Sequence, residues 1–407
     1  MIFPIIKKIN SLVMVIWIGA VSLLLTGCWD RQEINDVAIV LSTGIDYVKD
    51  DELEISAEFV IPEIMSATRK QGTSGAGVRT TFIESATGKT LAEARSKLQE
   101  KIARSLFWGH ADATVFGEEM AKKGIKEHLD YFARTPDARL RNTVFVCEGK
   151  AKDIISATPH LEDSASDTLN ELSNFQISMD VTMSELMQMT GSETGGALLP
   201  FVKQVSSSQK GKMKSKTQIL LSGVAVFNGN KMIGKLDESV TRGLLWVRDE
   251  IKNATITVEV DEGEDGEGEG KITALMIQSQ TKLIPRIEHG KWIITIQCST
   301  EDDLVQNASK LDIRKGETIH LLEGKFEEKI EERMKQAVEI VQKDMKVDVL
   351  KFNRAFQRKY RKEWKKRKGV WTDMYPNIEV QYDVTAKILR PGLSSEPPAV
   401  PNNEVKQ

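Results

Sequence analysis

The chain has 407 residues, of which 40% are apolar and 28% are charged, so its composition is that of a globular protein and not of a disordered or fibrous one. Its 56 Lys and Arg against 59 Asp and Glu give a formal charge of −3, which removes any whole-chain electrostatic case for nucleic-acid binding. Three cysteines and five widely spaced histidines argue against a disulfide scaffold and a metal cluster, so we expect neither a metal nor a cofactor.

Residues 1–27 predict a signal peptide that is removed from the mature chain. Lys7 and Lys8 precede an apolar run, 12–25, and small residues follow it, which is the order of a secretory signal. A helix that crosses a bilayer needs about 20 apolar residues, and this run has about 14, so a lasting transmembrane anchor is the weaker interpretation.

The segment Leu25-Thr26-Gly27-Cys28 resembles the lipobox of bacterial lipoproteins. In that motif the cysteine thiol accepts a diacylglyceryl group and the peptide is cut just before it. We therefore expect Cys28 to be the lipidation site and the mature chain to be tethered to membrane lipid, because two acyl chains make attachment lasting where one is marginal. A free buried cysteine that follows a signal by chance is the alternative.

Residues 28–202 are expected to form an N-terminal α/β region, because apolar strand patterns alternate there with helical ones. This region holds either one unit or two subdomains, the second of which includes 151–202. Thr90 and Glu93 have the spacing of a capping box at the start of a helix. The predicted strands are 37–48, 53–61, 81–85, 111–116 and 142–148, and the predicted helices are 90–106, 120–129, 164–174 and 182–189.

Residues 203–217 hold five Lys and four Ser without an acid, which predicts a linker. A C-terminal α/β domain is expected over 218–390, and 391–407 predict a disordered tail rich in proline. The predicted strands are 219–227, 254–260, 272–284, 292–298 and 379–388, with helices at 238–247 and 326–341. The fold class is therefore α+β, with two to three mixed α/β domains, each a β-sheet flanked by helices, after a cleaved lipoprotein signal peptide.

The motifs that could carry catalysis are all incomplete. Residues 88–90 stand between a strand and a helix like the end of a phosphate-binding loop, but Ile83 occupies the position of the first glycine. The turn at 191–195 lacks the central serine of a nucleophile elbow. The acidic run 261–269 lacks carboxylates at positions 3 and 12 of an EF-hand and is expected to be a solvated connection. We therefore expect no catalytic residue and no enzyme.

The segment 354–368 carries nine Lys and Arg against one Glu. The expected interpretation is a helix that docks an aromatic stripe into the core while its charges face water. Contact with an anionic lipid surface and binding of nucleic acid are the alternatives, in that order. The aromatic residues of the stripe, at four-residue spacing, are Phe352, Phe356, Tyr360 and Trp364.

Three further side chains are expected to be structural. Cys147 and Cys298 lie on apolar strand faces and predict buried thiols that form neither a disulfide nor a nucleophile. His110 has no second ligand at metal-binding spacing and is expected to be a hydrogen-bonded structural residue.

Several segments together resemble the Ger(x)C family, the lipoprotein C subunits of nutrient germinant receptors in spore-forming bacteria. The most specific is 25–36, in which the lipobox runs directly into Cys28-Trp29-Asp30 and then Glu33-Ile34-Asn35-Asp36. The other segments that carry the resemblance are 107–110, 117–125, 149–155, 223–227 and 236–246.

This resemblance implies a fold of three mixed α/β domains and a non-enzymatic subunit in which Cys28 is lipidated. It also implies a place at the cell membrane, on the outer face of the spore's inner membrane, beside the integral-membrane A and B subunits. The resulting hypothesis is a lipid-anchored C subunit that acts through protein–protein contacts and binds no nucleic acid. The alternatives are a tethered solute-binding protein that serves a transporter, which needs a ligand cleft, and an envelope hydrolase, which needs convergent acid and base groups.

Overall fold

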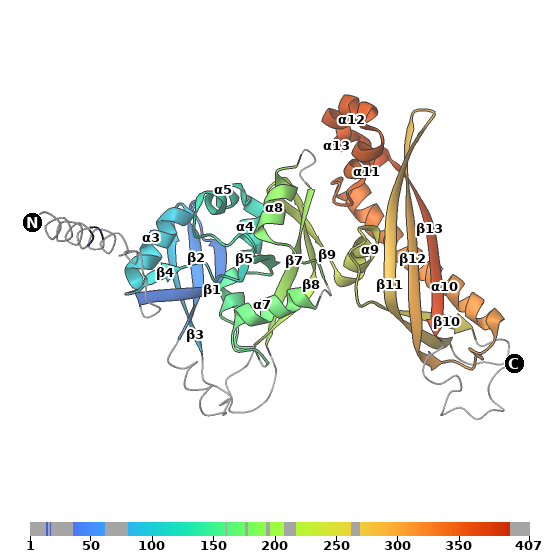
Figure 1. Ribbon diagram of the computed structural model, residues 1–407, viewed down its shortest axis with the longest axis horizontal. Coiled ribbons are helices and arrows are strands. Elements are labelled where there is room, and N and C mark those ends of the chain that lie inside the picture. Colours follow the sequence, from blue (N-terminus) through green and yellow to red (C-terminus); the bar gives the residue numbers. More distant parts are fainter. Residues whose placement is uncertain are drawn as a thin grey trace, which may run out of the picture.

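The protein contains two β-sheets with helices packed around them (Figure 1). The described residues do not include Cys28, the predicted tail 391–407 or most of the acidic run 261–269, and they include only Met14 and Trp17 of the predicted signal peptide 1–27. The residues that the computed structural model describes are Met14, Trp17, 36–61, 80–159, 161–175, 178–192, 196–206, 217–261 and 269–390.

The N-terminal sheet has nine strands: β1 (Val37–Tyr47), β2 (Leu53–Val60), β3 (Thr81–Gly88), β4 (Ser105–Phe107), β5 (Ala113–Gly117), β6 (Thr143–Cys147), β7 (Gly196–Ser206), β8 (Thr217–Asn228) and β9 (Lys231–Leu236). Their order is β3-β2-β1-β5-β6-β7-β8-β9, and β4 pairs with the start of β1. Strands β1, β5, β6 and β7 are parallel neighbours, whereas the outer strands pair antiparallel. The centre of the sheet is therefore parallel and both flanks are antiparallel.

Helices cover both faces of this sheet: α3 (Leu91–Lys101), α4 (Glu118–Lys123), α5 (Lys126–Arg134), α6 (Ala151–Ile155), α7 (Ala165–Asn174) and α8 (Met183–Thr190). Neighbouring residues of β5 enter different apolar clusters, because successive side chains of a strand point to opposite faces. Val115 packs in the cluster that includes α6 and α7, and Phe116 packs in the cluster that includes α3, α4, α5 and α8. Both faces are buried, as is typical of parallel strands.

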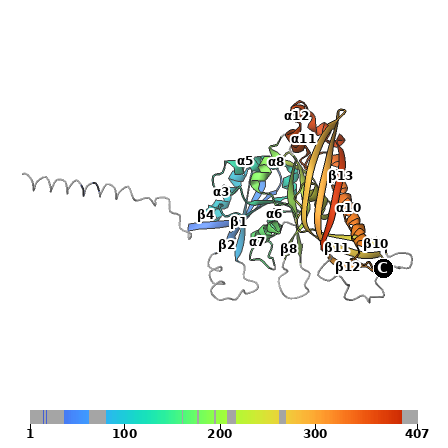
Figure 2. The same ribbon diagram turned by 45° about the vertical axis from the view of Figure 1, so that its right-hand side comes forward.

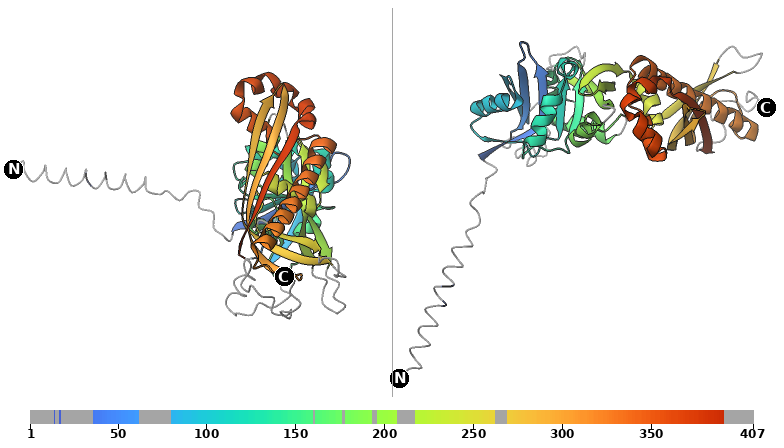
Figure 3. Two further views of the ribbon diagram at one scale, coloured as in Figure 1. Left: turned by 90° about the vertical axis from the view of Figure 1, so that its right-hand side faces the viewer. Right: turned by 90° about the horizontal axis from the view of Figure 1, so that it is seen from above.

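The C-terminal half is a four-stranded sheet in the order β10 (Thr255–Asp261), β11 (Glu269–Glu288), β12 (Lys291–Ala308) and β13 (Glu379–Arg390). Strands β10, β11 and β12 pair antiparallel, and β13 returns parallel to β12. Helix α10 (Gly316–Glu339) lies obliquely across this sheet, as the orange helix in Figure 3 shows. The larger apolar cluster continues from the N-terminal sheet through α9 (Glu238–Val247) into this half, so the two sheets share a core.

A helical lobe connects α10 to β13 and projects at one end of the C-terminal sheet (Figure 2). It begins after the π-helical turn η2 (Ile340–Asp344). It consists of α11 (Phe352–Lys359), α12 (Arg361–Arg367), η3 (Lys368–Val370), α13 (Trp371–Met374) and η4 (Tyr375–Asn377).

The predicted fold class is confirmed, since mixed sheets flanked by helices account for the described chain. Residues 203–217, however, do not separate the two sheets. Strands β7 and β8 pair antiparallel from Val202 opposite Leu221 to Ser206 opposite Thr217, so 203–206 and Thr217 are strand residues of the N-terminal sheet, whereas 207–216 lie outside the described residues. The N-terminal sheet therefore continues through β8 and β9 to Leu236. A composition rich in lysine and serine predicts a linker, but it does not show whether the flanking residues pair in a sheet.

Two predicted helices have other bounds than expected. The helix after Thr90 stops at Lys101, and Leu106 lies in β4. The helix expected over 120–129 is divided into α4 and α5, because Gly124 at φ 129° adopts a backbone conformation that ends α4.

The capping expected at Thr90 is present in modified form. Its hydroxyl accepts a hydrogen bond from the Glu93 amide at 3.2 Å, as predicted. The Glu93 carboxylate, however, accepts from the amide of Lys89, one residue before the position that a capping box uses.

Helices α9 and α10 cross closely at Gly243. A methyl group at this position would lie 2.0 Å from the carbonyl oxygen of Arg333, whereas one at Gly324 on α10 would meet no atom within 4 Å. We predict that Gly243→Ala lowers the free energy of unfolding in urea by about 1–3 kcal/mol, because the helices must move apart. Gly324→Ala is the matched control and should raise it by about 0.5–1 kcal/mol, because alanine favours the helix. Equal stabilisation by both changes would contradict the close crossing.

Candidate functional site

Asp46 on β1 is a buried carboxylate that binds the first turn of α6. Its two oxygens accept hydrogen bonds from the amides of Ala151 at 2.7 Å and Lys152 at 3.0 Å. Burial raises the pKa of Asp46, and these two amide hydrogen bonds oppose that effect. The side chain of Lys152 turns to Glu54 on β2, with 2.6 Å between the ammonium nitrogen and the carboxylate oxygen. Asp46 thus positions α6 on the sheet and has no free acid or base role.

Glu58 on β2 is a second buried carboxylate, and it binds the first turn of α7. This side chain is 1% exposed and accepts hydrogen bonds from the amides of Ala165 at 3.2 Å and Ser166 at 3.1 Å. The hydroxyls of Ser42 at 2.7 Å and Thr81 at 3.0 Å donate to it as well. Burial raises the pKa of Glu58 while these four donors oppose the rise. Four donors satisfy the carboxylate, so it is a structural anchor and is not poised for proton transfer.

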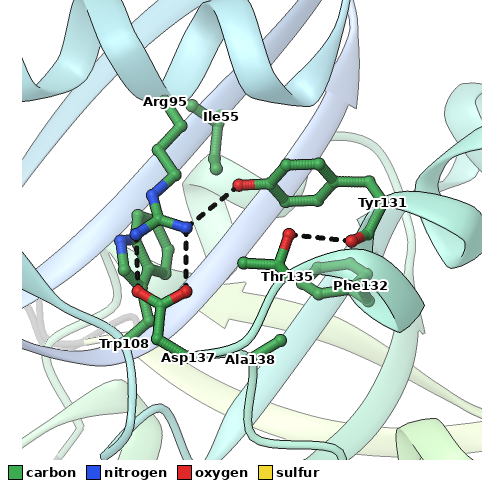
Figure 4. Close-up of a pocket in the computed structure, with 8 residues that line it drawn as sticks. All are labelled: Ile55, Arg95, Trp108, Tyr131, Phe132, Thr135, Asp137 and Ala138. Carbon is green, nitrogen blue, oxygen red and sulfur yellow. Dashed lines mark hydrogen bonds and ion pairs between the residues drawn. The ribbon is translucent and has the colours of Figure 1, made fainter.

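A small pocket lies between α3 and α5 (Figure 4). The guanidinium of Arg95 makes two hydrogen bonds to Asp137, at 3.1 and 2.5 Å, and a third to the Tyr131 hydroxyl at 3.2 Å. It also lies 5.2 Å from the ring centroid of Trp108. The lining residues are Ile55, Arg95, Trp108, Tyr131, Phe132, Thr135, Asp137 and Ala138.

The volume of this pocket is about 20 Å³, which is room for about one water molecule. Small-molecule sites typically enclose about 300–1,000 Å³. The charge of Arg95 is already paired with Asp137, so no anion is needed to balance it. The pocket in this state has neither the space nor the unpaired charge to hold a nutrient.

Asp348 organises the helical lobe. It is buried and accepts hydrogen bonds from the amides of Phe352 at 3.1 Å and Asn353 at 2.7 Å, at the start of α11. The indole of Trp371, on α13, donates a third at 3.1 Å. Burial raises the pKa of Asp348 to about 6, although these hydrogen bonds act in the opposite direction. One carboxylate therefore joins two helices that are separate in the sequence.

The aromatic stripe of the lobe packs into the core as predicted, with Phe352, Phe356 and Trp364 buried and Tyr360 half-buried. Its rings pack against Trp371, whose ring centroid lies 4.9 Å from that of Trp364. The predicted single helix is wrong, however. The backbone leaves helical geometry at Tyr360 (φ −119°, ψ 57°), so α11 and α12 are separate helices.

The other predicted residues are placed as follows. Cys147 and Cys298 are free, and both are buried as predicted; burial raises the pKa of both thiols. His110 is exposed, with its ring centroid 5.5 Å from that of Phe107. Gly88 ends β3 and Thr90 caps α3, so the described chain uses residues 88–90 to join a strand to a helix.

The described residues were also compared with the requirements of a membrane-spanning helix and of a metal site. None of their helices combines the length and the apolar composition that crossing a bilayer requires. Across the same residues, no three His, Cys, Asp or Glu side chains gather where they could hold a metal ion.

Comparison with known families gives the class of protein. A family model described as "Spore germination protein N-terminal domain" matches residues 30–204, and one described as "Spore germination B3/ GerAC like, C-terminal" matches residues 222–392. Together the two models account for most of the chain. The chain therefore belongs to the GerAC-like family of spore germination proteins, which confirms the resemblance found in its sequence.

The similarity to individual relatives extends over nearly the whole length of both chains. "Putative spore germination protein YfkR" of Bacillus subtilis (strain 168) is 25% identical, over 88% of this chain and 91% of the relative. "Spore germination protein KC" and "Spore germination protein B3" of the same organism are 23% and 25% identical, over 92% and 91% of this chain and 94% and 95% of each relative. The crystal structure of the GerBC protein has a similar fold, with a TM-score of 0.54 at 20% identity over 85% of this chain and 96% of that one.

The raised pKa of Asp348 predicts a pH dependence of stability. A folded-state pKa of about 6 lies above the ordinary 3.8, so the contribution of this group is fully present below about pH 4 and is lost as the pH rises through about 6. Between about pH 4 and pH 7 the free energy of unfolding of the natural chain should fall by about 2 kcal/mol more than that of Asp348→Asn, which cannot ionise.

Urea unfolding of both proteins at several pH values measures this difference. Asp302, whose pKa is also raised to about 6 by burial, is present in both proteins and its effect cancels. Asp373→Asn is the control for the substitution itself, because it replaces an exposed carboxylate of the same lobe. Parallel profiles for the natural chain and Asp348→Asn would contradict the prediction.

Proposed function

We propose that this protein is the lipid-anchored C subunit of a nutrient germinant receptor and is required for spore germination. It would act by protein–protein contacts with the integral-membrane A and B subunits on the outer face of the spore's inner membrane. The observation that carries the proposal is the family match over both halves of the chain. The first matched region begins at residue 30, two residues after Cys28, so the proposed lipid anchor directly precedes the body that defines the family.

A non-catalytic role accords with the geometry of the buried polar groups. Asp46, Glu58 and Asp348 each accept hydrogen bonds from helix amides, and Arg95 is paired with Asp137. Groups that are paired in this way hold elements together and are not free to bind and activate a substrate. We therefore propose that the protein is not an enzyme and uses no cofactor.

The anchor is tested with Cys28→Ala. We expect this chain to leave the membrane fraction or to accumulate as an uncut precursor, because the thiol that would carry the lipid is missing. Membrane fractionation and mass spectrometry of the amino terminus give the result. Cys298→Ala is the control, since its thiol is buried in the core and the change should leave attachment and processing intact. Normal processing and membrane attachment of Cys28→Ala would refute the anchor.

The tethered solute-binding alternative is tested by calorimetric titration of the full mature chain with amino acids, sugars and nucleosides. We expect no binding with a micromolar Kd, because the proposed subunit acts through protein contacts and the Arg95 pocket of the described residues has room for about one water molecule. Circular dichroism of the same sample shows that the chain is folded. Saturable micromolar binding of one of these compounds would favour the solute-binding function over the proposed one.

A further inference from the structure

The outer surface of the helical lobe concentrates positive charge. We call residues 352–370 the basic lobe. They span α11, α12 and η3, and the one acidic side chain among them is Glu363. The exposed cations of the basic lobe are Arg354, Arg358, Lys359, Arg361, Lys362, Lys365, Lys366, Arg367 and Lys368.

The described residues place no carboxylate against the cations at 354–367. Elsewhere its helices pair lysine with glutamate, as in Lys122 with Glu118 at 2.9 Å and Lys329 with Glu332 at 2.7 Å. Within the described residues, no carboxylate forms an ion pair with any cation of the basic lobe from 354 to 367. One of these cations instead contacts the backbone: the Arg358 guanidinium donates a hydrogen bond to the carbonyl oxygen of Arg354 at 3.3 Å.

The spacing of the cations works against the helices that carry them. Arg354 and Arg358 are four residues apart on α11, and α12 repeats this spacing between Lys362 and Lys366. Like charges at this spacing lie on one helix face and destabilise it. The repulsion would be relieved by an anionic surface placed against the lobe.

The cations stand on a rigid base. Trp364 packs on Trp371, and Trp371 is hydrogen-bonded to the buried Asp348. The ring of Phe356 lies 4.6 Å from that of Trp292 on β12, which ties α11 to the sheet. Val370 is the last residue of the basic lobe, and this apolar residue is 42% exposed. Exposed cations with an apolar side chain at their edge are typical of surfaces that lie against lipid headgroups.

We propose that the basic lobe binds an anionic lipid surface and forms a second membrane contact besides the amino-terminal anchor. This inference rests on the proposed function, because that function places the chain beside a bilayer. The lobe belongs to the half of the molecule that lies away from β1, where the described chain begins (Figures 1 and 3). An anchor on one half and an electrostatic contact on the other would hold the molecule in one orientation. Lipid is favoured over an acidic protein face because the proposed function places the chain beside a bilayer and the apolar side chain of Val370 is exposed at the edge of the cations.

The test measures binding of a chain that begins at residue 28 and carries Cys28→Ala, so that no acyl group contributes. This chain contains every helix and strand named above. We expect it to float with vesicles of phosphatidylcholine that contain about 30% phosphatidylglycerol and to remain unbound with phosphatidylcholine alone. Raising the salt from about 0.05 M to about 0.5 M should release it, because exposed charges are then screened over a few ångströms.

The lobe variant neutralises four cations together: Arg358→Gln, Lys362→Gln, Lys365→Gln and Lys366→Gln. Its affinity for the anionic vesicles should fall at least about tenfold, since each cation near such a surface contributes to binding. The matched control makes the same change in net charge on the N-terminal half, at four exposed cations, and should bind as the unsubstituted chain does. The control substitutions are Lys49→Gln, Lys89→Gln, Arg104→Gln and Lys126→Gln.

Equal loss in both variants would overturn the proposal, because net charge and not the lobe would then determine binding. Absence of binding to anionic vesicles would also overturn it and would assign the lobe to an acidic protein face. Neither result bears on the anchor, because every chain in this test lacks the Cys28 thiol. Conversely, normal amino-terminal processing of Cys28→Ala in cells would refute the anchor and leave the vesicle result standing, because membrane attachment alone can come from the basic lobe.

Discussion

Buried carboxylates that bind the amides of helix N-termini hold this molecule together. Asp46 and Glu58 stand on neighbouring strands and bind α6 and α7, so the sheet itself sets where these helices lie. Asp348 acts in the same way on α11 and adds the Trp371 indole. Loss of either side of such a contact leaves a buried charge or unpaired amides, each of which is costly away from water. Each carboxylate and the helix that it binds therefore depend on each other.

The sequence predicts local features of the fold better than these long-range contacts. The start of α8 was predicted correctly at Thr182, where the structure shows a capping box with Glu185, whose partners are three residues apart. The contact between Asp46 and Ala151 spans 105 residues, and a lone aspartate within a strand pattern gives no sign of it. The hairpin β7–β8 was missed for a related reason, because strand pairing depends on register, and the composition of 203–217 reports only exposure.

The helical lobe shows how a correct pattern can still give a wrong element. The four-residue aromatic spacing correctly predicted a buried stripe, and Phe356 and Trp364 both face the core. The spacing continues across the break at Tyr360, so the pattern of apolar residues contains no sign of the break. The proposed lipid site at Cys28 is of the opposite kind. The lipobox in the sequence predicts this site. Cys28 lies outside the described residues, so the site stays a prediction from sequence.

The net charge of the chain conceals an uneven distribution of charge. Residues 354–368 hold nine cations and one acid, and their charge of +8 leaves −11 on the rest of a chain whose total is −3. The total excludes attraction of the whole body to a polyanion, but it does not describe a molecule with one strongly basic end. Near an anionic surface the body would be repelled while the basic lobe is attracted. The same electrostatics that keeps the body in water would therefore select the orientation in which the lobe faces the membrane.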